Sequence, residues 1–202
     1  MLALCAVLAA LSLRPWRAWP ADGPPWPWLA WWAVLPALWG ADRYAQVPLV
    51  QPLSGACLLM LMAGWPLTVL ALLPVAAVVT LMAGLDVAEG LHRLVWLGLV
   101  PATLALALGA AVRRWLPHHL FVYILGRGFF ATAIAGSVAG LLSVGLQGAP
   151  DGLQAGDVAL ARFLAAWGDA FLSGMMVAIF VAFRPEWLAT YTDRLYLPVS
   201  RP

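Results

Sequence analysis

The sequence predicts an all-α, polytopic membrane protein whose residues 1–202 form a single integral membrane domain. Of the 202 residues, 64% are hydrophobic and 10% are charged, whereas about 25% of an ordinary soluble domain is charged. The mean hydropathy is +0.90. Because this number of charged side chains is too small to cover a water-exposed surface, we expect the surface to face lipid. A soluble enzyme, a disordered protein and a nucleic-acid binder are excluded.

Seven apolar stretches define a transmembrane bundle of six to seven helices. They are residues 2–13, 27–40, 46–62, 65–83, 94–112, 119–145 and 155–183. The third to fifth stretches have the roughly 17–25 residues that a helix needs to cross a bilayer. The first two are shorter and are expected to be tilted, re-entrant or partly interfacial. A signal peptide has a positively charged segment before its apolar part, and residues 2–13 have none. This favours a retained helix, and a cleaved signal peptide stays the alternative.

Proline, glycine and charged residues separate these stretches. Residues 18–28 contain four prolines, which exclude a regular helix, and several tryptophans, which suit a membrane–water interface. Residues 64–66 (Gly-Trp-Pro) separate the third stretch from the fourth. Polar loops are expected at residues 86–93, 113–119 and 148–156.

The arginines are distributed unevenly between the two sides of the predicted bundle. If the N-terminus is outside, one side receives Arg43 and Arg93. The other side receives Arg14, Arg17, Arg113, Arg114, Arg184, Arg194 and Arg201. Because cytoplasmic loops of membrane proteins are enriched in arginine and lysine, the C-terminus is expected in the cytoplasm. We therefore predict a multi-pass protein of the bacterial cytoplasmic (inner) membrane.

Three ionisable residues lie inside predicted spans, namely Arg127, Arg162 and Asp169. Charged groups at membrane depth are costly, so each is a functional hypothesis. Asp169 either faces a polar cavity on a substrate path or tethers its helix to Arg127 or Arg162. Arg162 precedes Asp169 by seven residues and so shares its helix face. Arg162 can also lie at the interface, with its head group extended toward water.

Small residues predict close packing of the last two stretches. Gly136 and Gly140 form a G-x-x-x-G pattern in residues 119–145, and Gly168, Ser173 and Gly174 offer a similar smooth surface in residues 155–183. Such surfaces let transmembrane helices approach closely. We expect this packing to bring Asp169 toward Arg127.

Six residues are candidate transition-metal ligands, because imidazole, carboxylate and thioether groups bind such ions. They are His92, His118, His119, Asp169, Met175 and Met176. The alternatives are an interfacial position for the adjacent histidines, whose side chains diverge by about 100° on a helix, and a packing role for the methionines. The sequence contains no nucleotide-binding, zinc-protease or serine-hydrolase motif, so no enzymatic activity is predicted.

Two stretches carry a family resemblance. Residues 116–130 read Leu-Pro-His-His-Leu-Phe-Val-Tyr-Ile-Leu-Gly-Arg-Gly-Phe-Phe, and residues 168–176 read Gly-Asp-Ala-Phe-Leu-Ser-Gly-Met-Met. Residues 55–56, 64–67, 183–187 and 191–197 add to the pattern. Over residues 48–197 the chain resembles energy-coupling factor ABC transporter permeases, a divergent branch of the CbiM-like cobalt/nickel uptake family.

The resemblance implies a substrate-binding permease component for uptake of a transition-metal ion. In such a system a scaffold membrane subunit and ATPase subunits are separate proteins. The family's metal binders begin with Met-His, whereas here Leu2 follows Met1 and the first histidine is His92, so that ligand pair is absent. The alternative function is a non-transporting membrane assembly factor or an accessory subunit of another membrane complex.

Overall fold

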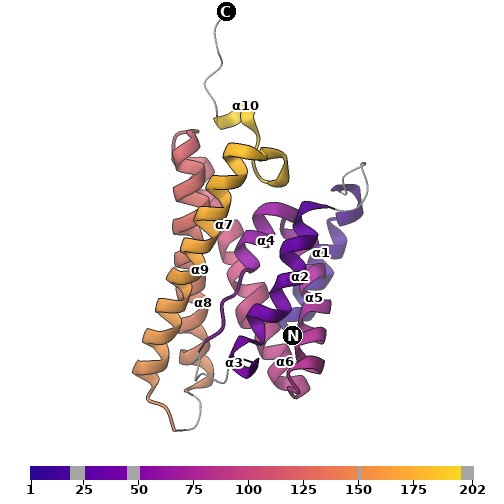
Figure 1. Cartoon of the computed structure of the whole chain (residues 1–202), viewed down its shortest axis with the longest axis vertical. Helices are drawn as coiled ribbons and strands as arrows, with labels where there is room; N and C mark the ends of the chain where they lie inside the picture. The colour runs from indigo at the N-terminus through magenta and orange to yellow at the C-terminus, as the bar shows by residue number, and fades with distance from the viewer. Residues whose placement is uncertain (19–25, 45–50, 150–151, 197–202) are drawn as a thin grey trace, which may run out of the picture.

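The computed structural model describes residues 1–18, 26–44, 51–149 and 152–196, and every regular element in these ranges is helical (Figure 1). Four helices are long and apolar enough to cross a membrane. They are Trp65–Met82, Val87–Trp115, Val122–Gln147 and Ala155–Phe183. The prediction of an all-α protein with transmembrane helices is confirmed at this level.

The first long helix, α5 (Trp65–Met82), supports two short N-terminal helices. These are α1 (Leu2–Ser12) and α2 (Pro27–Trp39), and both pack against α5. Pro74 lies inside α5 and lacks the N–H that a helix interior requires. In the turn before it, the carbonyl of Ala71 accepts a hydrogen bond of 2.7 Å from the indole of Trp32. The indole therefore joins α2 to α5 beside the proline.

The second long helix is built from α6 (Val87–Arg93), the π-helical segment η2 (Leu94–Leu99) and α7 (Val100–Trp115). The predicted polar loop at residues 86–93 is wrong. Asp86 is the N-cap of α6 and accepts a hydrogen bond from the Glu89 N–H at 2.6 Å, which starts the helix before the apolar run.

The third and fourth long helices form an antiparallel pair. The π-helical segment η3 (Val122–Phe130) continues into α8 (Ala131–Gln147), and α9 (Ala155–Phe183) returns beside it (Figure 1). A Cβ atom on Gly136 would lie 2.9 Å from the Cβ of Ala166, and one on Gly140 would lie 2.9 Å from the Cβ of Arg162. The predicted close packing through small residues is confirmed.

The remaining described elements are short. They are η1 (Pro15–Ala18), α3 (Ala41–Tyr44), η4 (Pro185–Trp187) and α10 (Asp193–Tyr196). In Figure 1, α3 and α6 lie at the lower end of the molecule and α10 lies at the upper end. Part of the predicted proline–tryptophan segment (residues 19–25) and Arg201 lie outside the described residues.

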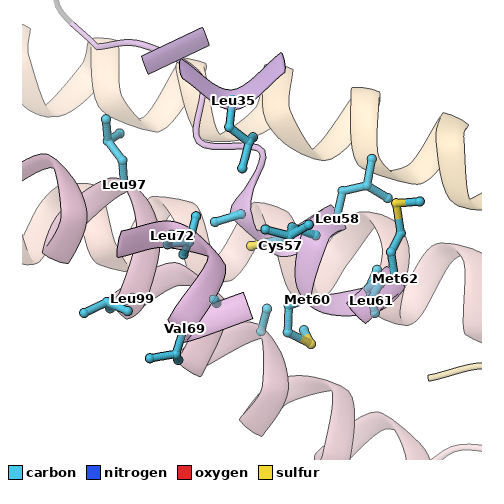
Figure 2. Packing of buried hydrophobic residues seen from close by; sticks show 14 of the residues in the cluster. Leu35, Cys57, Leu58, Met60, Leu61, Met62, Val69, Leu72, Leu97 and Leu99 are labelled. Atoms are coloured by element: carbon cyan, nitrogen blue, oxygen red, sulfur yellow. The ribbon is translucent and has the colours of Figure 1, made fainter. Parts of the chain in front are cut away.

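The third predicted span, residues 46–62, is wrong as a continuous helix. Residues 51–54 are not helical, and α4 covers only the eight residues Ala56–Ala63. Pro52 and Gly55, which adopts a φ of +63°, account for the break, because proline and left-handed glycine both interrupt a helix. All eight residues of α4 are buried. Figure 2 shows its side chains among those of α2, α5 and η2.

Candidate functional site

The backbone just before α4 is non-helical and lies inside the bundle, where its polar groups need protein partners. Two indole N–H groups supply them. Trp39 donates to the Ser54 carbonyl at 2.7 Å, and Trp31 donates to the Gly55 carbonyl at 2.9 Å. The Ser54 hydroxyl in turn donates to the Leu97 carbonyl in η2. Side chains of α2 therefore hold the interrupted segment in place.

Asp169 holds the N-terminal end of α4. Its Oδ1 accepts a hydrogen bond of 2.9 Å from the Gly55 N–H, and the residue is 3% exposed. Gly55 is the N-cap of α4 and has no side chain to cap it, and the Ser54 hydroxyl accepts from the Ala56 N–H at 3.2 Å. A carboxylate at this end satisfies an otherwise unpaired N–H and interacts favourably with the helix dipole. Asp169 thus joins the long helix α9 to the short helix α4.

The chain that follows α9 holds the other end of α4. The Thr190 N–H and hydroxyl both donate to the Leu61 carbonyl, at 3.3 and 3.1 Å, and the Ala189 N–H donates to the Met62 carbonyl at 3.1 Å. These are carbonyls of the last turn, which have no partner within the helix. Both ends of α4 are therefore held by segments that lie far along the sequence, 114 residues away for Asp169 and Gly55 and 129 for Thr190 and Leu61.

Arg127 contacts the segment after α9 that holds the C-terminal end of α4. Its Nη1 donates to the Thr190 carbonyl at 3.2 Å, and its guanidinium carbon lies 5.4 Å from the ring centre of Tyr123. The expected pairing of Asp169 with Arg127 is absent from the described part of the chain, where no ion pair involves Asp169. The two side chains serve opposite ends of α4, and its eight residues rise by about 12 Å.

A cleft of about 1270 Å³ has residues of α3 and α6 in its lining. These two helices lie near the lower end of the molecule in Figure 1. Side chains of α1, α3, α6, η2, α8 and α9 line the cleft. Its polar lining includes Asp42, Glu89, His92, Arg93, Ser143 and Arg162. The lining also includes Pro52 of the interrupted segment and Leu97, whose carbonyl accepts the Ser54 hydrogen bond. Asp169 is not part of the described lining.

The carboxylates of the cleft are already paired. Arg93 is 7% exposed and donates to both oxygens of Asp42, at 2.8 and 2.6 Å, and to Glu89 at 2.8 Å. Arg43 approaches Glu89 to 3.1 Å. Burial alone would raise the pKa of Asp42, but the hydrogen bonds and charge of Arg93 outweigh it and hold the pKa below its ordinary value. Asp42 is therefore ionised and paired at neutral pH.

Arg162 is the exception among these charges. It is 9% exposed, and its Nη1 donates to the Gly140 carbonyl at 3.4 Å, a long hydrogen bond. Its Nε has no hydrogen-bond partner, and within the described ranges no carboxylate lies within 4.0 Å of its guanidinium. The predicted tether between Arg162 and Asp169 is therefore not formed. Arg162 is buried between α8 and α9 and lines the cleft.

The structure does not bring the predicted metal ligands together. His92 lines the cleft. The His118 ring lies tilted against the ring of Tyr196 in α10, and the Nδ1 of His119 accepts from the Phe121 N–H at 3.2 Å. Met175 is 57% exposed; Met176 packs against the hydrophobic core. In the described ranges, no group of three or more His, Cys, Asp or Glu residues could hold a metal ion.

The sequence identified Asp169 and Arg162 as important positions but not the residues that hold the interrupted segment beside Asp169. Trp31, Trp39 and Ser54 hold the interrupted segment, and the sequence signal for them was Pro52 followed by Gly55 inside an apolar run. Such a break leaves backbone groups that need side-chain donors and acceptors.

Comparison with known proteins adds no identification. No protein-family model, curated protein or solved structure matches this chain. Its functional assignment therefore depends on the geometry of the interrupted segment and the cleft.

Proposed function

We propose that this chain is a membrane-embedded substrate-binding or permease component. The observation that supports the proposal is a cleft with several charged lining residues, which includes Gln51 and Pro52 of the interrupted segment before α4 in its lining. Transporters commonly bind substrates where a discontinuous helix exposes backbone groups near the middle of the bilayer. Here the chain is likewise interrupted before α4, and the cleft reaches Pro52 in that interrupted segment.

The arginine distribution supports an outward-facing cleft. Arg43 and Arg93 lie at the cleft end, whereas Arg113, Arg114 and Arg194 belong to α7 and α10, which reach the opposite end (Figure 1). By the positive-inside rule, the opposite end faces the cytoplasm. The proposed topology has seven crossings, with α1, α2 and residues 51–63 as short ones, in a bacterial inner membrane.

The cargo and the partners stay predictions of the family resemblance. A transition-metal ion as substrate, a scaffold subunit and ATPase subunits are implied by it, but the described residues gather no metal site.

One observation favours the alternative of a non-transporting assembly factor. Asp169 is buried and accepts a hydrogen bond from the backbone N–H of Gly55, as expected where helices pack together without a water-filled cavity. The cleft favours transport, since an assembly role needs no opening lined by charged residues.

Filling the cleft is expected to abolish uptake. Ser143 is 1% exposed and lines the cleft, whereas its neighbour on α8, Leu142, is 47% exposed. We expect Ser143→Trp to reduce uptake to the level of cells that lack the chain, and Leu142→Trp to leave it unchanged. The measurement is uptake of radiolabelled nickel, cobalt, phosphate and succinate by cells with matched protein levels.

Two results would count against the proposal. One is full uptake by Ser143→Trp. The other is uptake that never depends on the chain, combined with stable co-purification of another membrane protein, which would favour the assembly factor.

A further inference from the structure

We propose that Arg162 forms an oxyanion-binding subsite in the cleft. The ligand is a carboxylate or phosphate group, carried either by a free solute or by a lipid head group. This inference deepens the proposed function and rests on it, since it names the chemical class of the substrate. The evidence for this inference is the burial, the position and the unpaired state of the Arg162 guanidinium. The inference does not depend on the metal-binding hypothesis.

The charges of the cleft leave one buried cation uncompensated. Asp42 and Glu89 are bound by Arg93 and Arg43, and the Asp86 carboxylate caps α6. Arg162 has no such partner among the described residues. A buried charge without a partner is costly. An anion entering the cleft would supply the missing partner, whereas a divalent cation would meet carboxylates that are already paired.

The Arg162 guanidinium has hydrogen-bond donors to spare. It carries five N–H groups, of which one makes a long hydrogen bond to the Gly140 carbonyl and the Nε–H makes none. The planar fork of a guanidinium matches two oxygens of a carboxylate or phosphate. The free donors therefore suit a bidentate oxyanion.

Two neighbouring helices position this side chain. Gly140 has no side chain, and a Cβ there would lie 2.9 Å from the Arg162 Cβ, so the arginine stem lies directly against α8. His92 and Ser143 line the same cleft from α6 and α8 and add polar groups to it. Arg162 is therefore held between helices and lines the cleft, as a binding residue requires.

The test measures binding directly on the purified full-length chain, without transport. Thermal unfolding is followed in phosphatidylcholine nanodiscs with inorganic phosphate, and with chloride at the same ionic strength. A second set of nanodiscs contains phosphatidylglycerol. We expect phosphate to raise the unfolding temperature of the native chain, and Arg162→Gln to weaken phosphate binding by at least about tenfold, since hydrogen bonds to charged groups contribute this much. Arg114→Gln, outside the cleft, is the matched control and should bind normally.

Each outcome decides the proposal. Stabilisation by phosphate that requires Arg162 supports a free anion, and stabilisation only by phosphatidylglycerol that requires Arg162 supports a lipid head group. If Arg162→Gln does not fold, Arg162→Lys keeps the charge, loses the fork and should bind more weakly than the native chain. The proposal is overturned if neither ligand stabilises the native chain, or if the Arg162 variants respond as the native chain does. Such a failure would not decide the proposed function, which the uptake measurement tests separately.

Discussion

Replacing Asp169 by leucine is expected to destabilise the protein by about 2–3 kcal/mol, because the buried Gly55 N–H then has no acceptor. Asp169→Asn keeps an oxygen at the position of Oδ1, which accepts the Gly55 hydrogen bond in the native chain. We therefore expect Asp169→Asn to lose less than about 1 kcal/mol. The measurement is the thermal unfolding of both purified variants in one detergent.

A native thiol gives a local readout of the same change. Cys57 is the second residue of α4 and is 1% exposed, and Cys5, which is exposed, is replaced by serine. The Cys57 thiol should react faster with a maleimide in Asp169→Leu than in Asp169→Asn. Equal unfolding temperatures and equal labelling rates in the two variants would show that Asp169 does not hold α4.

Gly136→Val is expected to separate α8 from α9. A Cβ at Gly136 would lie 2.9 Å from the Ala166 Cβ and 3.4 Å from its Cα, and backbone cannot yield without moving the whole helix. Overpacking of this kind costs about 1–3 kcal/mol, and we expect the upper end of that range. At Gly145, on the same helix, an added Cβ would meet nothing within 4 Å.

Gly145→Val is therefore the matched control, since it makes the same chemical change on the same helix in open space. Its effect should be within about 0.5 kcal/mol, as for other exposed substitutions. The comparison uses the unfolding temperature of each purified variant. A similar loss in both variants would mean that intrinsic helix propensity, and not the α8–α9 contact, determines the result.

The long helices could be predicted because hydropathy and small-residue spacing are local properties of the sequence. Gly136 and Gly140 indicated the α8–α9 contact correctly for this reason. Residues 46–62 were misread because their composition stays apolar across Pro52 and Gly55. Hydropathy reports which solvent a segment prefers, and it does not report whether the backbone is continuous.

The cleft could not be predicted, because its charges meet only in three dimensions. Residues 86–93 looked like a solvated loop, yet Arg93 is buried by pairing with Asp42, 51 residues earlier. The same limit applies to Asp169, whose partner proved to be a backbone N–H of Gly55 and not an arginine. Single charged residues in a span identified the important positions, but their partners depend on the fold.

Labelling of the cleft from outside the cell tests the outward-facing entrance most directly. Cys5 and Cys57 are replaced by serine, and single cysteines are placed at Ala88, which lines the cleft on α6 and is exposed, and at Ser173, which is 0% exposed in α9. A membrane-impermeant maleimide is applied to intact cells. We predict that Ala88→Cys is labelled and Ser173→Cys is not. Labelling of Ala88→Cys only after the cells are permeabilised would contradict an outward-facing entrance.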